Sequence, residues 1–122
     1  MKDYIIRATA ADGYIRAFAA QTTQMVEVAR KKHKLYPIAS AALGRTMTAA
    51  SMMAIDLKGE RDSLSIIIKG GGPIGSIVVV AYANGMVKGY VDNPFVDLPL
   101  NDKGKLDVAG VVGTNGKLTV IK

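Results

Sequence analysis

The stretch from Pro37 to Leu57 constrains the fold of this chain more than any other part of its sequence. Its only charged residues are Arg45 and Asp56, and alanine, methionine, leucine and isoleucine make up most of the rest. Most of these residues favour helix, and a helix of this length spans about 30 Å, the width of a small domain. We therefore predict a long helix at the centre of the fold, ending near Gly59, a residue suited to a left-handed cap. The two charges and the small polar residues argue against a membrane span.

The predicted helix has one face of larger apolar residues and one row of small residues. At about 100° per residue, the first face is an apolar stripe that would be buried. It comprises Ala39, Leu43, Met47, Ala50, Ala54 and Leu57. The second row comprises Ser40, Gly44, Thr48 and Ser51. Because these residues are small, we expect another element to pack closely against them.

Length and composition limit the protein class. With 122 residues, of which 49% are hydrophobic, we expect residues 1–122 to form one domain, soluble and without a membrane partner. There is no cysteine, so disulfides and thiolate metal ligands are excluded. The opening residues lack the apolar run of a signal peptide, which favours a cytoplasmic location.

Charge favours acidic partners but does not identify one. The formal net charge is +6, and such a balance attracts anions, nucleic acid included. The only dense basic run, Arg30 to Lys34, contains no interleaved aromatic residue. We interpret it as a solvated helix end, and a nucleic-acid partner as unlikely.

Three pairs of a turn residue followed by glycine predict hairpins. They are Asp12-Gly13, Asn84-Gly85 and Asn115-Gly116. The predicted strands are Asp3 to Thr9, Tyr14 to Ala20, Ser63 to Lys69, Gly75 to Ala83, Met86 to Val91, Val111 to Thr114 and Lys117 to Ile121. The run Ile77 to Val80 is typical of a strand covered on both faces. In the first hairpin the alternation is only partial, so its buried face stays open.

A shorter helix is predicted from Gln24 to His33, capped by Thr22 or Thr23. Together the elements predict an α+β fold. It has an antiparallel sheet built from hairpins, with the long central helix and the shorter helix packed on it.

Catalytic chemistry finds little support. His33 is the only histidine, and no carboxylate pair has a spacing that indicates acid–base catalysis. The Gly70–Gly75 loop, GGGPIG, resembles a phosphate-binding loop but lacks the following lysine and Ser/Thr, so a tight strand connection is the simpler interpretation. We predict no enzyme and no catalytic, cofactor-binding or metal-ligating residue.

Several segments, in order along the whole chain, resemble one family. They are Tyr4 to Thr9, Leu43 to Thr46, Lys69 to Gly75, Gly85 to Val91 and Val112 to Val120. Together they resemble the N-terminal domain of the redox-regulated heat-shock chaperone family, the bacterial 33 kDa chaperonin.

The resemblance implies an ATP-independent holdase that binds unfolding client proteins through apolar surface. In that family a C-terminal domain binds zinc through four cysteines, oxidation releases the metal, and the active form is a dimer. This chain has no such cysteines. We therefore expect an incomplete N-terminal domain that holds no cofactor.

Met52, Met53 and Ile55 are the candidates for a client-binding surface, with core packing as the simpler interpretation. We expect self-association, most simply as a dimer, through pairing or exchange of the strand Lys117 to Ile121. Two alternatives stay open: a basic nucleic-acid-binding module, and a small-molecule enzyme using the Gly70–Gly75 loop.

Overall fold

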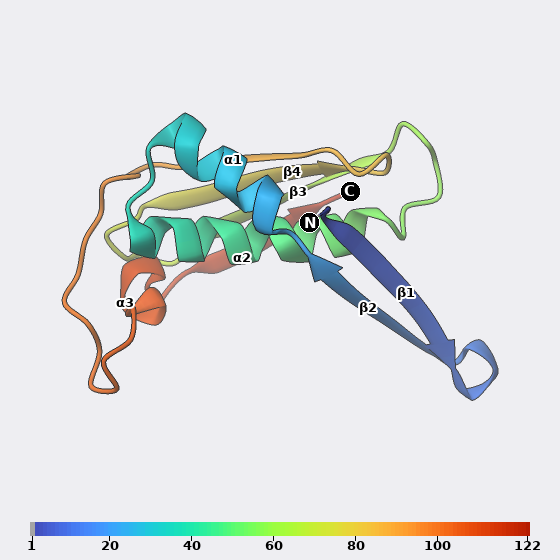
Figure 1. Ribbon diagram of the computed structural model, residues 1–122, viewed down its shortest axis with the longest axis horizontal. Helices are drawn as coiled ribbons and strands as arrows, with labels where there is room; N and C mark the ends of the chain where they lie inside the picture. Colours follow the sequence, from blue (N-terminus) through green and yellow to red (C-terminus); the bar gives the residue numbers. More distant parts are fainter. Residues whose placement is uncertain (1) are drawn as a thin grey trace.

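The computed structural model describes residues 2–122 and combines helices with two antiparallel sheets (Figure 1). The elements are β1 (Tyr4–Ala10), a 3-10 turn (Ala11–Gly13), β2 (Ile15–Gln21), α1 (Thr23–His33), α2 (Pro37–Ala54), β3 (Ser63–Lys69), β4 (Ser76–Tyr82), β5 (Val87–Val91), α3 (Val108–Val112) and β6 (Lys117–Ile121). Strands β1 and β2 pair only with each other, and the second sheet has the order β5-β4-β3-β6. The predicted mixed fold of helices on antiparallel sheet is confirmed, with two sheets in place of one.

Helix α2 is the centre of the hydrophobic core, as predicted. It begins at Pro37, and its apolar stripe is buried as far as Ala54. It packs against the inward faces of β3, β4 and β5, where Leu64, Ile66, Ile77, Val79 and Ala81 are buried. The helix and the inward faces of these strands therefore form the hydrophobic core together.

The predicted end of this helix is wrong by three residues. The last regular residue is Ala54, and the cap residue Ile55 has an ordinary φ of −67°. The amide of Leu57 donates to the carbonyl of Ala54 at 3.1 Å, so the chain leaves the helix through a tighter turn. Gly59 is no left-handed cap; its amide donates to the carboxylate of Asp62 at 2.9 Å.

Helix α1 packs against the row of small residues on α2. A β-carbon on Gly44 would lie 2.8 Å from Val26 Cγ1, so only glycine fits here without a shift. The hydroxyls of Thr22 and Thr48 are 2.7 Å apart and share a hydrogen bond. The prediction of a closely packed second element is thus confirmed.

The four-stranded sheet is covered by α2 on one face only. Ile77 and Val79 of β4 are buried beneath the helix, whereas Val78 and Val80 on the opposite face are half-buried. The expectation that β4 is covered on both faces is wrong for the described residues, because no element lies over its outer side.

The third predicted hairpin is also wrong. Residues Val108–Val112 form α3, with Asp107 accepting a hydrogen bond from the amide of Gly110 at 3.0 Å. The strand β6 pairs with β3 instead, in the register Lys69↔Lys117 to Ser65↔Ile121. Asn115-Gly116 lies in the connection between α3 and β6, and a strand distant in sequence, not the preceding residues, pairs with β6.

The glycine-rich connection between β3 and β4 packs tightly against the end of α3. The amide of Gly72 donates to Val112 O and that of Ile74 to Val111 O, both at 3.1 Å. A β-carbon on Gly113 would lie 2.1 Å from Gly70 O. The structure agrees with a tight strand connection, since backbone amides that a phosphate would need already donate to carbonyls.

Candidate functional site

The hairpin β1–β2 projects from one end of the molecule (Figure 1). Its register runs from Tyr4↔Gln21 to Ala10↔Ile15. Directly opposed residues of an antiparallel pair point to the same side. One side therefore carries seven apolar residues and no charge, and we call it the apolar hairpin face. It comprises Tyr4, Ile6, Ala8, Ala10, Ile15, Ala17 and Ala19, all of them exposed.

The opposite side of the hairpin packs against the C-terminal end of α2. Phe18 is half-buried there, in a cleft it shares with Met52 and Met53. Nearby, Arg16 Nη1 lies 2.8 Å from Asp56 Oδ1 in an exposed ion pair. The alternation left open which side of this hairpin is buried. Neither side is buried in the core, and the side that carries Arg16 faces α2.

The tip of the hairpin departs from the predicted two-residue turn. Ala10 pairs with Ile15, so four residues form the connection. Ala11, Asp12 and Gly13 have φ values of 51°, 56° and 87°. The positive φ expected at Asp12 and Gly13 is present, but Ala11 adopts it too and lengthens the loop.

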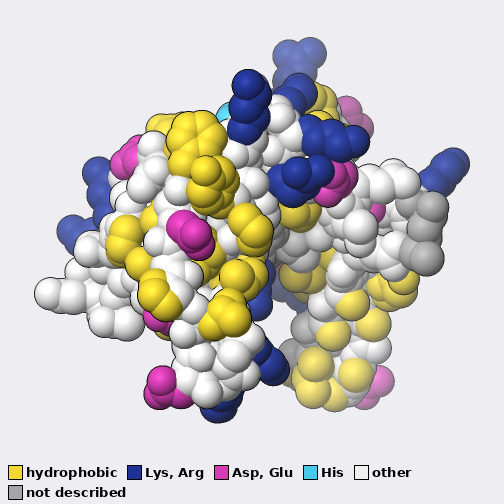
Figure 2. Space-filling model, turned by 60° about the vertical axis from the view of Figure 1, so that its left-hand side comes forward, with side chains coloured by type: hydrophobic (Ala, Val, Ile, Leu, Met, Phe, Trp, Pro, Cys, Tyr) yellow, Lys and Arg dark blue, Asp and Glu magenta, His cyan; other side chains and the backbone are white. Residues whose placement is uncertain are grey.

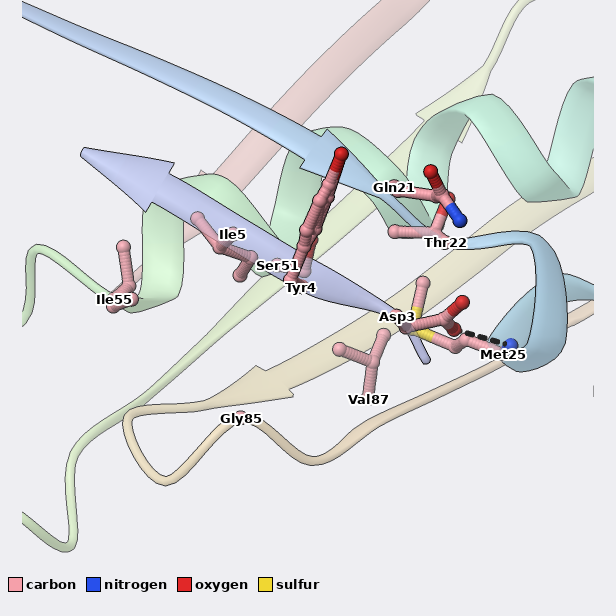
Figure 3. A pocket seen from close by; sticks show the side chains of 10 residues that line it. All are labelled: Asp3, Tyr4, Ile5, Gln21, Thr22, Met25, Ser51, Ile55, Gly85 and Val87. Carbon is pink, nitrogen blue, oxygen red and sulfur yellow. Dashed lines mark hydrogen bonds between the residues drawn. The ribbon is translucent and has the colours of Figure 1, made fainter. Parts of the chain in front are cut away.

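Asp3 joins the base of the hairpin to α1 (Figure 3). Its carboxylate accepts from the amide of Gln24 at 3.0 Å and from that of Met25 at 2.7 Å. A carboxylate here satisfies amides that a helix start leaves free, and it complements the helix dipole. The predicted cap by Thr22 or Thr23 is wrong: neither side chain caps the helix, and that of Thr22 bonds to α2.

The three predicted client-binding residues lie at or just after the C-terminal end of α2 and are divided between two clefts. Ile55 lines a cleft of about 400 Å³ together with Tyr4, Ile5 and Val87 (Figure 3). The other two residues, Met52 and Met53, line a cleft of about 270 Å³ with Phe18, Asp56 and Lys122. None of the three is in the buried core, and Met53 is 39% exposed.

The larger apolar surface is one that the sequence reasoning did not select. Its residues were visible as the alternation of Tyr4, Ile6 and Ala8, and of Ile15, Ala17 and Ala19. What the sequence lacks is the placement of α2, whose end lies beside Phe18 and Arg16 on the other side of the hairpin.

Residues suited to metal binding are scarce. Within residues 2–122 no three side chains of His, Cys, Asp or Glu come together as a metal site. The zinc site implied by the resemblance needs cysteines, and the chain has none. Nor is any helix in this described part long and apolar enough to cross a membrane.

Comparison with known proteins gives the family. The model of the family described as "Hsp33 protein" matches residues 3–122. The chain belongs to the Hsp33 family. The 33 kDa chaperonin of Acetivibrio thermocellus is 62% identical over 122 residues, which are all of this chain and 41% of that protein. The 33 kDa chaperonin of Thermoanaerobacter sp. (strain X514) is 57% identical, with 42% of its length covered.

A solved Hsp33 structure has the same fold. The crystal structure of the 33 kDa chaperonin from Thermotoga maritima superposes with a TM-score of 0.86 at 32% identity. The match covers 96% of this chain and 44% of that one. The chain thus spans about two-fifths of the length of the Hsp33 proteins it resembles.

Proposed function

We propose that this chain binds unfolding proteins as an ATP-independent holdase in the cytoplasm. The observation that carries the proposal is the apolar hairpin face: seven neighbouring apolar residues without a charge, on a hairpin that has no buried residue. Soluble proteins rarely expose a contiguous apolar surface of this kind unless it binds something. Membership of a family whose members are named chaperonins supports the same function.

The chemistry of an unfolding client fits such a face. Unfolding exposes apolar side chains, and their burial against Tyr4, Ile6 and Ile15 contributes about 25 cal/mol per Å² of apolar surface. The alanines between these larger residues leave a flat surface that accepts many sequences. The flexible side chains of Met52 and Met53 can extend the contact beyond the hairpin, together with Ile55.

Capture of a client by this face requires no nucleotide and no redox step within the chain. The candidate phosphate loop is packed against α3, and its amides at Gly72 and Ile74 donate to backbone carbonyls. Control by oxidation of zinc thiolates requires cysteines, which these 122 residues do not have. A redox switch of the kind that the resemblance implies therefore belongs outside them.

An aggregation time course tests the holdase function. We expect this chain to suppress light scattering by a heat-unfolded model enzyme without ATP, and Ile6→Asp to abolish most of that suppression. Leu100→Asp is the matched control, because Leu100 is 60% exposed and Ile6 55%. Circular dichroism verifies that both variants fold. No suppression by the unaltered chain at large molar excess, or full activity of Ile6→Asp, would refute the proposal.

We further propose that the chain associates with itself through β6. This strand pairs with β3 on one side and lies at the edge of its sheet, and Leu118 and Ile121 are 60% and 54% exposed. Edge strands of this kind template pairing with, or exchange into, another chain. Sedimentation equilibrium should show a dimer that Leu118→Lys weakens, whereas a strictly monomeric mass at the highest concentrations would exclude it.

A further inference from the structure

A second surface, distinct from the hairpin, lies on the uncovered side of the four-stranded sheet. Tyr82 of β4 and Lys88 and Tyr90 of β5 all point to this side, since their strand neighbours Ala81, Val87 and Val91 pack inward. The ammonium of Lys88 lies 5.5 Å from the centre of the Tyr82 ring. Tyr90 follows two residues along the strand and is 49% exposed.

Helix α1 brings basic residues to the same edge of the sheet. His33, at its end, lines two clefts together with Lys88: one of about 350 Å³ with Tyr82 and Tyr90, and one of about 260 Å³ with Lys32. Figure 2, which views the molecule from another side, shows Lys and Arg side chains beside the histidine. We call these five residues, Lys32, His33, Tyr82, Lys88 and Tyr90, the basic-aromatic surface.

The charge of this surface is not neutralised. Neither cleft is lined by an Asp or Glu from the described chain, 2–122. The nearby acid Glu27 is occupied by Arg30, whose Nε lies 3.0 Å from both carboxylate oxygens, and that hydrogen bond lowers the pKa of Glu27. Neither Lys32 nor Lys88 forms an ion pair within the described residues. An anionic partner is therefore favoured.

We propose that the basic-aromatic surface binds single-stranded nucleic acid. Tyr90 and Tyr82 stack on bases, while Lys32 and Lys88 contact phosphates. Exposed aromatic rings on a β-sheet, flanked by basic side chains, are how several folds hold single strands. An acidic peptide would explain the lysines but not the two tyrosines. A duplex is disfavoured because its base faces are stacked inside and out of reach of the rings.

The sequence could not reveal this arrangement. From the sequence alone, nucleic acid is an unlikely partner, because the run Arg30 to Lys34 contains no aromatic residue. The fold supplies the aromatic residues from β4 and β5, more than forty positions away along the chain.

Fluorescence anisotropy with labelled oligothymidylate and oligouridylate tests the proposal. We expect binding that falls between about 50 and 200 mM salt, with Lys32→Ala reducing the salt slope by about one. Tyr90→Leu should weaken binding at least about fivefold, because it removes one stacking platform. The matched controls are Lys103→Ala and Tyr14→Leu, which make the same changes at exposed positions outside both clefts. They should bind within about twofold of the unaltered chain.

Two further probes separate the sources of binding. Inorganic polyphosphate has charge without bases, so an affinity equal to that for the oligonucleotides, together with no effect of Tyr90→Leu, would overturn the proposal. Tighter binding of a poly-glutamate peptide than of either oligonucleotide would do the same. The holdase assay stays independent: Tyr90→Leu should keep aggregation suppression, and Ile6→Asp should keep oligonucleotide binding.

Discussion

The hairpin β1–β2 and the layer formed by α2 on the four-stranded sheet are two regions with opposite physical character. In the layer, Leu43, Ala39 and Val79 are fully buried, and the sheet closes over one side of the helix. In the hairpin no residue is buried. An isolated two-stranded hairpin is marginally stable in water at best. The hairpin must therefore depend on its attachments to the layer.

Those attachments are few and mostly polar. Asp3 binds the start of α1, Arg16 pairs with Asp56, and Phe18 leans on the end of α2. Burial stabilises the layer cooperatively, whereas hydrogen bonds and one aromatic contact hold the hairpin. This chain can therefore present an apolar surface without disturbing its core, because the hairpin that carries the surface contributes little to the core.

Truncation of a core residue should have the largest effect and gives the first test of this contrast. We expect Leu43→Ala to lower the free energy of unfolding by about 3–5 kcal/mol, through lost burial and the cavity it leaves. Leu43 is 0% exposed, and its Cδ1 lies so close to β5 that a β-carbon on Gly89 would be 3.1 Å away from it. Ile6→Ala, on the apolar hairpin face, should change the same quantity by about 0.5 kcal/mol or less. Urea unfolding followed by circular dichroism measures both.

The contrast would fail if the two variants were equally destabilised. That result would mean that the apolar hairpin face is packed against another part of the protein in solution, for example in a self-associated form. Repeating the urea titration at several protein concentrations distinguishes this case, because stability that rises with concentration indicates association.

The sequence predicted the layer better than the hairpin, for physical reasons. The apolar pattern on α2 repeats over about five turns, so periodicity alone predicts the burial of Ala39, Leu43, Met47, Ala50 and Ala54. Ala42 and Thr46 are buried as well, although they lie in neither predicted row. The short run Val111 to Thr114 has no such repeat, and its β-branched residues suggested a strand. Contact with the Gly70–Gly72 backbone made it the end of a helix instead.

Residues that form the surfaces were harder to predict, because each surface joins segments that are distant in sequence. Met52, Met53 and Ile55 are close in sequence, which predicts one shared surface, but the structure divides them between two clefts. The cap of α1 shows the same limit. Thr22 beside the helix is the local candidate, but Asp3, nineteen residues earlier, provides the carboxylate.

Loss of the Asp3 contact should have a smaller effect on stability, confined to the hairpin and the start of α1. Asp3→Ala removes an acceptor from two amides at the start of α1, which typically costs about 0.5–2 kcal/mol. Since this contact also joins β1 to α1, we expect the amides of β1 and β2 to exchange hydrogen faster, while those of β3 and β4 stay protected. Hydrogen exchange followed by mass spectrometry, with peptides covering each sheet, resolves the two regions.

The matched control for this variant is Asp107→Ala. Asp107 also accepts a backbone hydrogen bond at a helix start, from Gly110 at 3.0 Å, but it belongs to α3 and touches no part of the hairpin. It should speed exchange around α3 and leave β1 and β2 unchanged. Equal exchange of the hairpin in both variants would show that Asp3 serves only as a cap and does not hold the hairpin in place. If Asp3→Ala instead loosens the hairpin selectively, the hairpin is a separately opening unit, and the Asp3 carboxylate is one of the contacts that fix the position of its apolar face.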